Sequence, residues 1–374
     1  MSELKPKEKL SAEIDKARSE IKTDDYPMSF GELANLYKDG ELRINPAYQR
    51  LFRWSNSQKS AFFESILIGI PIPPIFVFEL ANGHWELIDG LQRTSTVLEF
   101  FGLLNTEDGN PVAYSVLSST QYLPSLEGAV WDEEAEKVNI GSHEIGSENR
   151  IAIKRSKIGI QILRKGSEEK SKFELFQRLN GNGTPLDPQE FRTCVMVMLN
   201  ESLYEQCAEY AKGDNFRRLI NISAKQEEKQ QDLDYLCRFL AHMSAELDKR
   251  FDVDEYITHQ VKELFVAGDA AKLLKLMQDT ADLLVNHVGD NCLRKYDGEK
   301  FTGKVGKTAF EVVFVGVASN FENVRDKDDV KSYVMEKISQ FWNDPDITKV
   351  LGAGVRGTQR IKTTVPFGKA LFSD

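Results

Sequence analysis

The sequence predicts an α+β N-terminal domain with a small mixed sheet, followed by an all-helical domain. Two apolar segments, 75–80 and 84–88, flank Ala81-Asn82-Gly83, and Asn-Gly tolerates the positive φ angles that tight hairpin turns need. From residue 187 to about residue 345, apolar residues instead recur with helical spacing. We therefore expect a charged tail or frayed helix over residues 1–25, a mixed domain over 26–185 and a mainly helical domain over 186–374.

Individual elements of the mixed domain follow from capping residues and from apolar periodicity. Ser29 is placed to cap a short helix beginning at Phe30, and Ser55 to cap a second helix that ends at Gly69. A helix is also expected from Leu91, and alternating apolar residues predict a strand over 157–163. Residues 103–150 show no clear period, so we expect an irregular inserted loop or small hairpin there.

Composition limits the class of protein. Asp and Glu outnumber Lys and Arg by 58 to 48, a net charge of −10, which argues against a protein that coats nucleic acid non-specifically. A local basic patch stays open, because basic residues gather between residues 150 and 172. No apolar run approaches the roughly 18–20 residues of a membrane span, and residues 1–25 contain no apolar signal core. We therefore expect a cytoplasmic protein without membrane contact.

The segment from Asp89 to Thr94 is the strongest candidate site. An apolar strand runs through Asp89-Gly90 into an amphipathic helix, which would place free backbone N–H groups and the positive end of the helix dipole at the turn. Gln92 and Arg93 would project from the first helical turn, so a phosphate is the natural occupant. The alternative is an ordinary strand-to-helix turn with an Asp cap.

Two further polar clusters lie before and after this turn. Tyr48-Gln49-Arg50, with Arg53 and Trp54 behind them, could stack a base and neutralise phosphate; the alternative is a solvated loop with Trp54 packed on a helix. The other cluster runs from Arg178-Leu179-Asn180 through two glycines to Glu190 and Arg192, where the alternative is a plain helix C-cap.

The order of these motifs resembles the ParB/sulfiredoxin-like domain of the GmrSD family of modification-dependent restriction proteins. The likeness rests on Tyr-Gln-Arg…Trp, Pro-Ile-Pro-Pro, Asp-Gly-x-Gln-Arg-x-x-Thr and Arg-Leu-Asn…Gly…Leu…Glu…Arg, over roughly residues 30–195. The resemblance implies a ParB/sulfiredoxin-type fold for the N-terminal domain. In this family an Asp-Gly-Gln-Gln-Arg motif is associated with binding and hydrolysis of nucleoside triphosphates.

Carried over by position, the resemblance implies a site for a nucleoside triphosphate of unknown base and Mg²⁺. Leu91 stands where the family motif has its first Gln, which removes a side chain that could contact nucleotide or metal. Asp89 is the candidate Mg²⁺ ligand. The implied catalytic residues are Asp89, Gln92 and Arg93, and the implied nucleotide-binding residues are Tyr48, Gln49, Arg50, Gly90, Thr94, Arg178 and Asn180.

Three functional hypotheses follow. The leading one is a nucleotide-binding and nucleotide-hydrolysing subunit of a bacterial or phage-encoded DNA restriction or anti-phage defence system. The second is a non-catalytic DNA- or protein-binding regulator with the same fold, and the third is a nuclease acting through the ParB-like domain. His287 has no second histidine after it to complete a His-Asn-His nuclease, so duplex DNA and a separate nuclease subunit are the expected macromolecular partners.

Two other motifs invite assignment. Gly303-Lys304-Val305-Gly306-Lys307-Thr308 ends like a phosphate-binding P-loop, but Phe301 stands where the first glycine is required, so we do not expect a P-loop. Near the C-terminus, Arg356, Gln359 and Arg360 lie in a Gly-rich stretch. We interpret them as a surface loop, with closure onto the N-terminal site as the alternative.

Overall fold

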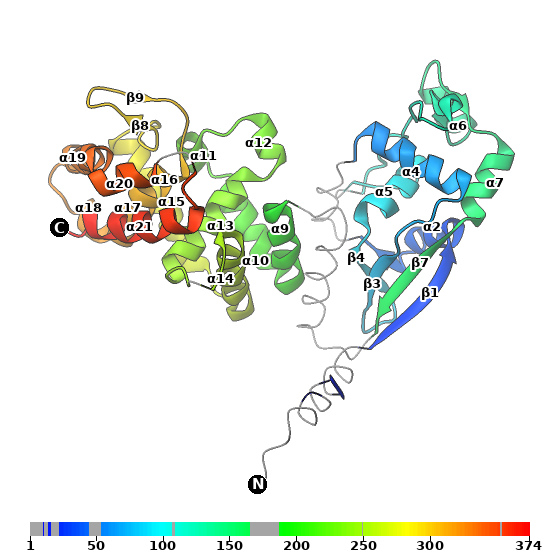
Figure 1. Ribbon diagram of the computed structural model, residues 1–374, viewed down its shortest axis with the longest axis horizontal. Helices are drawn as coiled ribbons and strands as arrows, with labels where there is room; N and C mark the ends of the chain where they lie inside the picture. The colour runs from blue at the N-terminus through cyan, green and yellow to red at the C-terminus, as the bar shows by residue number, and fades with distance from the viewer. Residues whose placement is uncertain are drawn as a thin grey trace, which may run out of the picture. The chain divides into compact units, whose positions relative to one another are not determined.

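The computed structural model describes residues 10, 14–15, 22–44, 54–106, 109–164, 187–248, 250–351 and 354–374. The chain divides into two compact units, Met1–Pro185 and Leu186–Asp374. In Figure 1 the first unit is coloured blue to teal and the second green to red. The mixed N-terminal unit and the helical unit that follows confirm the predicted α+β fold class.

A mixed sheet forms the base of the N-terminal unit. In the described part of the chain its strand order is β1-β7-β3-β4-β2, with β7 parallel to β3, β2 parallel to β4, and the other neighbours antiparallel. The hairpin predicted around Asn82-Gly83 is confirmed as β3 and β4. The strands are β1 (Thr23–Ser29), β2 (Leu42–Arg43), β3 (Ile75–Glu79), β4 (Trp85–Asp89) and β7 (Lys157–Leu163).

Helices cover one face of this sheet (Figure 1). Ile75, Val77 and Ile160 point from the strands into a core that Phe63 and Phe100 fill from the helices, and all five side chains are fully buried. The predicted caps are confirmed: Ser29 accepts from the Glu32 N–H, Ser55 forms a capping box with Gln58, and Gly69 ends its helix in the left-handed region. The helices are α2 (Phe30–Lys38), α4 (Asn56–Ile68), α5 (Leu91–Phe100) and α7 (Ser147–Arg155).

Two expectations for this unit need correction. β1 begins at Thr23, before the expected start of the domain at residue 26, because its backbone pairs with β7 along its whole length. Residues 103–150 are also more regular than expected. Trp131 is buried and stacks on Phe101 at 4.1 Å between ring centroids, so this segment is packed onto the core. It contains η1 (Pro124–Leu126), β5 (Ala129–Val130), α6 (Glu133–Val138) and β6 (His143–Glu144).

The C-terminal unit is built around α13, which is buried from Asp232 to His242. A small hairpin, β8 (Lys295–Tyr296) and β9 (Phe301–Thr302), interrupts the helices. The helices of this unit are α9 (Pro188–Leu199), α10 (Glu201–Ala211), α11 (Asp214–Ile220), α12 (Ala224–Glu228), α13 (Gln231–Ser244), α14 (Val253–Ala267), α15 (Ala271–His287), α16 (Lys307–Ala309), η2 (Phe310–Phe314), α17 (Val315–Ser319), α18 (Phe321–Arg325), α19 (Val330–Asn343), α20 (Pro345–Val350) and α21 (Gly357–Leu371).

The segment near the C-terminus is not the predicted surface loop. Arg360 lies in α21, and its guanidinium binds the fully buried carboxylate of Glu311, with an Nη2 to Oε1 distance of 2.9 Å. Thr364, one turn further along α21, donates to the same carboxylate. None of the helices in the described part of the chain has the length and apolar character that crossing a membrane requires.

Candidate functional site

The predicted strand-to-helix turn is present between β4 and α5. Gly90 is the N-cap residue of α5, with φ 97° and ψ 17°, a conformation that side chains with a Cβ rarely adopt. A Cβ at this position would also lie 2.3 Å from Cγ2 of Ile75. Two features therefore require glycine at position 90: the positive φ angle and the close approach of β3.

A shift in the strand register accompanies this turn. Val77 pairs with Leu87, but the next pair joins Phe76 to Asp89, so β4 carries an extra residue, Ile88. In a regular strand without a bulge, Asp89 would share the core-facing side of Leu87, because side chains two residues apart lie on the same face. The bulge brings Asp89 opposite Phe76 instead, and its side chain is 39% exposed. The strand end thus presents a carboxylate at the margin of the sheet.

Arg93 folds back over this strand end. Its Nη2 donates to Oδ2 of Asp89 at 3.0 Å and to the carbonyl oxygen of Pro74 at 3.1 Å. Its Nε is buried and has no hydrogen-bond partner among the described atoms. The guanidinium thereby joins the end of β4 to the residue before β3, and keeps one buried donor unused beside the turn.

Gln92 connects α5 to the chain that follows the first polar cluster. Its Oε1 accepts from the backbone N–H of Trp54 at 3.0 Å, and the Trp54 ring packs edge-on against Phe62. The packing of Trp54 matches the helix-contact alternative for this residue. Of the implied site residues, Tyr48, Gln49, Arg50, Arg178 and Asn180 lie outside the described residues.

Strand β2, which precedes the first polar cluster in the sequence, lies beside β4 in the sheet. β2 runs parallel to β4, with Leu42 beside Trp85 and Arg43 beside Glu86, so β2 leads toward the same edge of the sheet as Asp89. Ile44, at the end of β2, is buried in the core. The chain therefore enters and leaves the first cluster, at Ile44 and at Trp54, near the turn between β4 and α5.

The remaining positions of the motif face inward. Thr94 is fully buried, and its Oγ1 has no hydrogen-bond partner within the described part of the chain. Leu91, where the family motif has a glutamine, packs against the hydrophobic core of the unit. Leu91 thus contributes to packing and offers no polar group at the turn.

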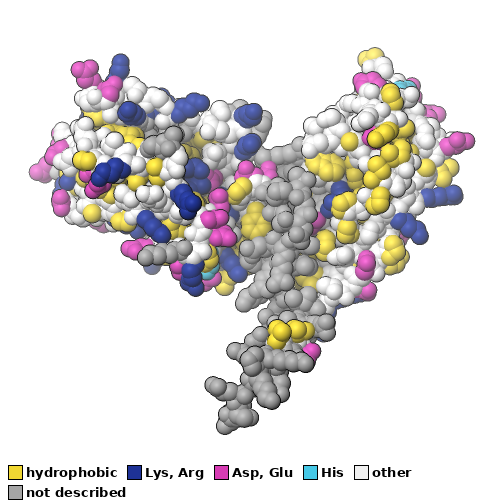
Figure 2. Space-filling model, in the orientation of Figure 1, with side chains coloured by type: hydrophobic (Ala, Val, Ile, Leu, Met, Phe, Trp, Pro, Cys, Tyr) yellow, Lys and Arg dark blue, Asp and Glu magenta, His cyan; other side chains and the backbone are white. Residues whose placement is uncertain are grey.

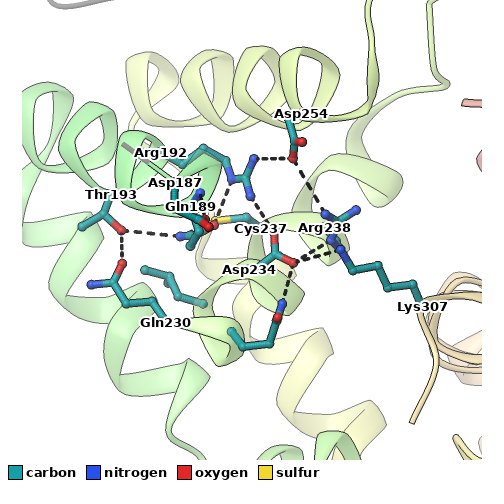
Figure 3. Close-up of polar contacts among 12 residues, drawn as sticks. Asp187, Gln189, Arg192, Thr193, Gln230, Asp234, Cys237, Arg238, Asp254 and Lys307 are labelled. Carbon is teal, nitrogen blue, oxygen red and sulfur yellow. Dashed lines mark hydrogen bonds and ion pairs between the residues drawn. The ribbon is translucent and has the colours of Figure 1, made fainter. Parts of the chain in front are cut away.

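The end of the third cluster lies in the helical unit. Glu190 completes a capping box with Asp187 at the start of α9. Arg192, 1% exposed, donates to Asp234 on α13 at 2.5 Å and to Asp254 on α14 at 3.1 Å (Figure 3). Arg238 also donates to Asp234, through Nε at 2.8 Å. These residues join three helices of one unit.

Electrostatics in this buried network favour the ionised carboxylate. Burial alone would raise the pKa of Asp234, but the adjacent Arg238 and Arg192 outweigh burial and hold that pKa below its ordinary value. Sequence reasoning did not find Asp234 or Arg238. The available signal was an aspartate and an arginine four residues apart on a helix that is otherwise apolar between Leu233 and Ala241.

Asp89 is the residue expected to ligate Mg²⁺. No group of three or more His, Cys, Asp or Glu residues placed to hold a metal ion occurs among the residues that the structure describes. Mg²⁺ in phosphate sites is commonly held by one or two carboxylates together with phosphate oxygens and water. A half-exposed carboxylate beside an uncapped helix N-terminus fits that pattern.

Two arginines of the basic segment between residues 150 and 164 have acidic partners within the unit. Arg150 pairs with Glu144 at 2.6 Å, and Arg164 binds both Asp24 and Glu79. On the visible face of the C-terminal unit, Lys and Arg are interspersed with Asp and Glu, whereas the visible face of the N-terminal unit is mainly hydrophobic and uncharged (Figure 2). These contacts support the interpretation of this segment as a solvated surface.

Comparison with known families identifies the first half of the chain. Residues 30–197 match the family described as GmrSD restriction endonuclease, N-terminal domain. The match contains the turn between β4 and α5, and it extends past residue 185 into α9. Searches of curated proteins and of solved structures find no match.

Proposed function

Since residues 30–197 are a GmrSD restriction endonuclease N-terminal domain, we propose that this chain binds and hydrolyses a nucleoside triphosphate within a DNA restriction or anti-phage defence system. The family is one of restriction and defence proteins. The observation that carries the proposal is the turn at Gly90, where a helix without a side-chain cap begins beside a buried Arg93 donor that has no partner among the described residues. Such helix starts bind phosphate through backbone N–H groups and the helix dipole.

Each residue at the turn has a proposed role. Gly90 brings the backbone close to the phosphates, Arg93 neutralises their charge, and Asp89 holds Mg²⁺ or positions a water molecule. Bound Mg²⁺ would supply charge neutralisation and polarise a phosphoryl oxygen. Gln92 fixes Trp54, and Thr94 supports the first turn of α5 from its buried side. Tyr48, Gln49, Arg50, Arg178 and Asn180 complete the proposed nucleotide contacts.

The nuclease in this proposal is a separate subunit. Asp89 belongs to no group of three or more metal-ligating side chains in the described part of the chain, so a two-metal nuclease centre at this turn has little support. Nucleotide turnover would instead bias how the chain engages duplex DNA or a His-Asn-His nuclease partner.

Leu91 favours a second candidate function. Because this side chain packs on the core, it offers no polar contact to nucleotide or metal. A chain that binds nucleotide without hydrolysing it, and regulates a DNA or protein partner, would retain Arg93 and Gly90 yet tolerate leucine at this position.

The two candidates are separated by measuring nucleotide affinity and phosphate release on the same samples. Arg93→Ala should weaken nucleotide binding by about 10- to 100-fold, the value of one charged hydrogen bond. Asp89→Asn should retain binding and lose Mg²⁺-dependent release. Arg150→Ala, which removes another ion pair of the same unit, is the matched control.

The outcomes are distinct. Unchanged affinity in Arg93→Ala, with circular dichroism equal to that of the parent chain, would overturn the nucleotide site. Binding by the parent chain without release, with Mg²⁺ and with or without duplex DNA, would favour the regulator. Release lost in Asp89→Asn supports the hydrolase.

A further inference from the structure

The buried network of the helical unit carries more positive than negative charge. Arg192, Arg238 and Lys307 all contact the carboxylate of Asp234, at 2.5, 2.8 and 3.8 Å (Figure 3). The other carboxylate within reach is Asp254, 3.1 Å from Arg192 and 3.9 Å from Arg238. Burying an uncompensated charge is costly, so an excess of cations at this depth calls for a further anion.

The nearest other charged groups do not supply that anion. Glu311 is engaged by Arg360, at 2.9 Å, and by the hydroxyl of Thr364. Asp232 lies on α13 but contacts Arg217 at 3.9 Å. Burial lowers the pKa of Lys307, and the neighbouring Arg238 lowers it further, as expected for a cation without sufficient counter-charge.

The cluster also has an unused donor and an opening to solvent. Arg238 is 4% exposed, and its Nη1 is buried without a hydrogen-bond partner in the described residues. The Lys307 side chain, in contrast, is 40% exposed. Lys307 is therefore the cation of this cluster that a ligand can reach from solvent, and Arg238 is the one with a donor to spare.

Lys307 occupies a helix start. α16, η2 and α17 follow one another without interruption from Lys307 to Ser319, and no side chain caps the beginning at Gly306. The preceding strand, β9, is only two residues long and pairs with β8 in a small hairpin. A P-loop would need a longer strand before it, so this agrees with the expectation that no P-loop is present. The lysine nevertheless stands where the helix dipole favours an anion.

We propose that Lys307 and Arg238 form an anion site in the helical unit that takes a phosphate group, with Arg192 supplying additional positive potential. Lysine and arginine are the usual phosphate ligands, and the amine and the free Nη1 can both donate. Each nitrogen of the Arg192 guanidinium already donates one hydrogen bond, to Gln189, Asp254 or Asp234, so we expect Arg192 to act mainly through its charge. Asp254, 47% exposed, stands at the edge of the cluster and opposes binding.

The test uses the full chain carrying Arg93→Ala, so that the proposed N-terminal nucleotide site does not contribute. Calorimetry with inorganic pyrophosphate, and separately with a short duplex DNA, measures affinity. Lys307→Ala should weaken binding about tenfold or more, as expected for one charge-assisted contact, and Lys307→Arg should restore most of it. Asp254→Asn should strengthen binding, because it removes a like charge.

Lys304→Ala is the matched control, since Lys304 is exposed in the same loop. Hydrogen exchange locates the site: pyrophosphate should protect peptides covering 231–244 and 307–319. Lys307-dependent binding of pyrophosphate alone identifies a small phosphate ligand, and Lys307-dependent binding of duplex identifies a phosphodiester. Equal affinities for both probes in the Lys307→Ala and Lys304→Ala chains would overturn the proposal.

Discussion

The two units each contain an arginine from a family motif, and they use it differently. Arg93 holds one carboxylate, Asp89, and the two side chains are 18% and 39% exposed. Arg192 holds Asp234 and Asp254, and with Asp234 it is almost completely buried, at 1% and 6% exposed. The comparison teaches that an arginine in a family motif does not by that fact belong to a ligand site. Arg93, in the first turn of α5, keeps part of its side chain exposed, whereas Arg192 on α9 is enclosed by packing.

Burial also sets the energetic difference. Removing one partner of a buried ion pair leaves an unpaired charge in the protein, which typically costs about 3–5 kcal/mol. Exposed pairs contribute about 0–1 kcal/mol, because water screens them and the side chains lose freedom. The helical unit should therefore depend on Arg192 for stability far more than the N-terminal unit depends on Arg93.

Arg192→Ala tests this contrast most strongly. The variant removes three hydrogen bonds, to Gln189, Asp234 and Asp254, and leaves a cavity where a side chain only 1% exposed was packed, so we expect a loss of about 3–5 kcal/mol in the helical unit. Native-state hydrogen exchange of peptides from α9 and α13 measures the change helix by helix. A loss below about 1 kcal/mol would mean that the pair of Arg192 and Asp234 contributes no more than an exposed ion pair, and that burial does not distinguish Arg192 from Arg93.

His242 makes the stability of the helical unit depend on pH. The ring is fully buried on α13, and burial, together with the charges of Arg238 and Lys369, lowers its pKa from 6.5 to about 3. The folded chain therefore stays neutral at this ring while the unfolded chain takes up a proton below pH 6.5. The free energy of unfolding should fall by up to about 1.4 kcal/mol per pH unit below that point.

Urea denaturation between pH 6.5 and 4.5 measures this dependence. His242→Gln should reduce the slope by about one proton, whereas His143→Gln, at an exposed site, should leave it unchanged. Equal slopes in all three chains would show that His242 is not responsible. The window lies above the range where Asp234, whose pKa is lowered, becomes protonated.

Local signals were sufficient for much of the fold. Ser29, Ser55 and Gly69 act where their residue types predicted, and Asn82-Gly83 turns the hairpin, because caps and tight turns depend on neighbouring residues. β1 was missed at its start because Thr23 to Asp25 are polar and gain their pairing from β7, more than a hundred residues away. Long-range pairing of that kind has no local signature.

The candidate site likewise combines features that neighbouring residues predict with features that depend on distant parts of the chain. The turn at Gly90 was predicted from a strand meeting a helix, both local features. The bulge that brings Asp89 opposite Phe76, and the carbonyl of Pro74 that fixes Arg93, depend on β3 and could not be read from the motif. Arg192 was named as part of a site, yet its partners on α13 and α14 lie far along the chain.

Gly90 and Gly83 have similar positive φ angles but different surroundings, so substituting each one separates the cost of the backbone angle from the cost of a steric clash. Gly90 and Gly83 have φ of 97° and 85°, but a Cβ at Gly83 would meet nothing within 4 Å, whereas one at Gly90 would meet Ile75. Gly83→Ala should cost about 1–2 kcal/mol through its backbone angle. Gly90→Ala should cost about 1–3 kcal/mol more through the clash, and should abolish nucleotide binding. Thermal unfolding measures both; equal losses would mean that Ile75 moves aside.

The smallest effect is expected for Arg218, a surface counterpart of Arg192 in the same unit. Arg218 pairs with Asp290 at 2.9 Å and contacts Asn215, but its side chain is 53% exposed and that of Asp290 41%. Arg218→Ala should therefore change the stability of the helical unit by no more than about 1 kcal/mol, measured by the same hydrogen exchange as for Arg192→Ala. Raising the salt concentration should reduce even this, because an exposed pair is screened while a buried one is not. A loss equal to that of Arg192→Ala would show that burial is not what distinguishes the two arginines.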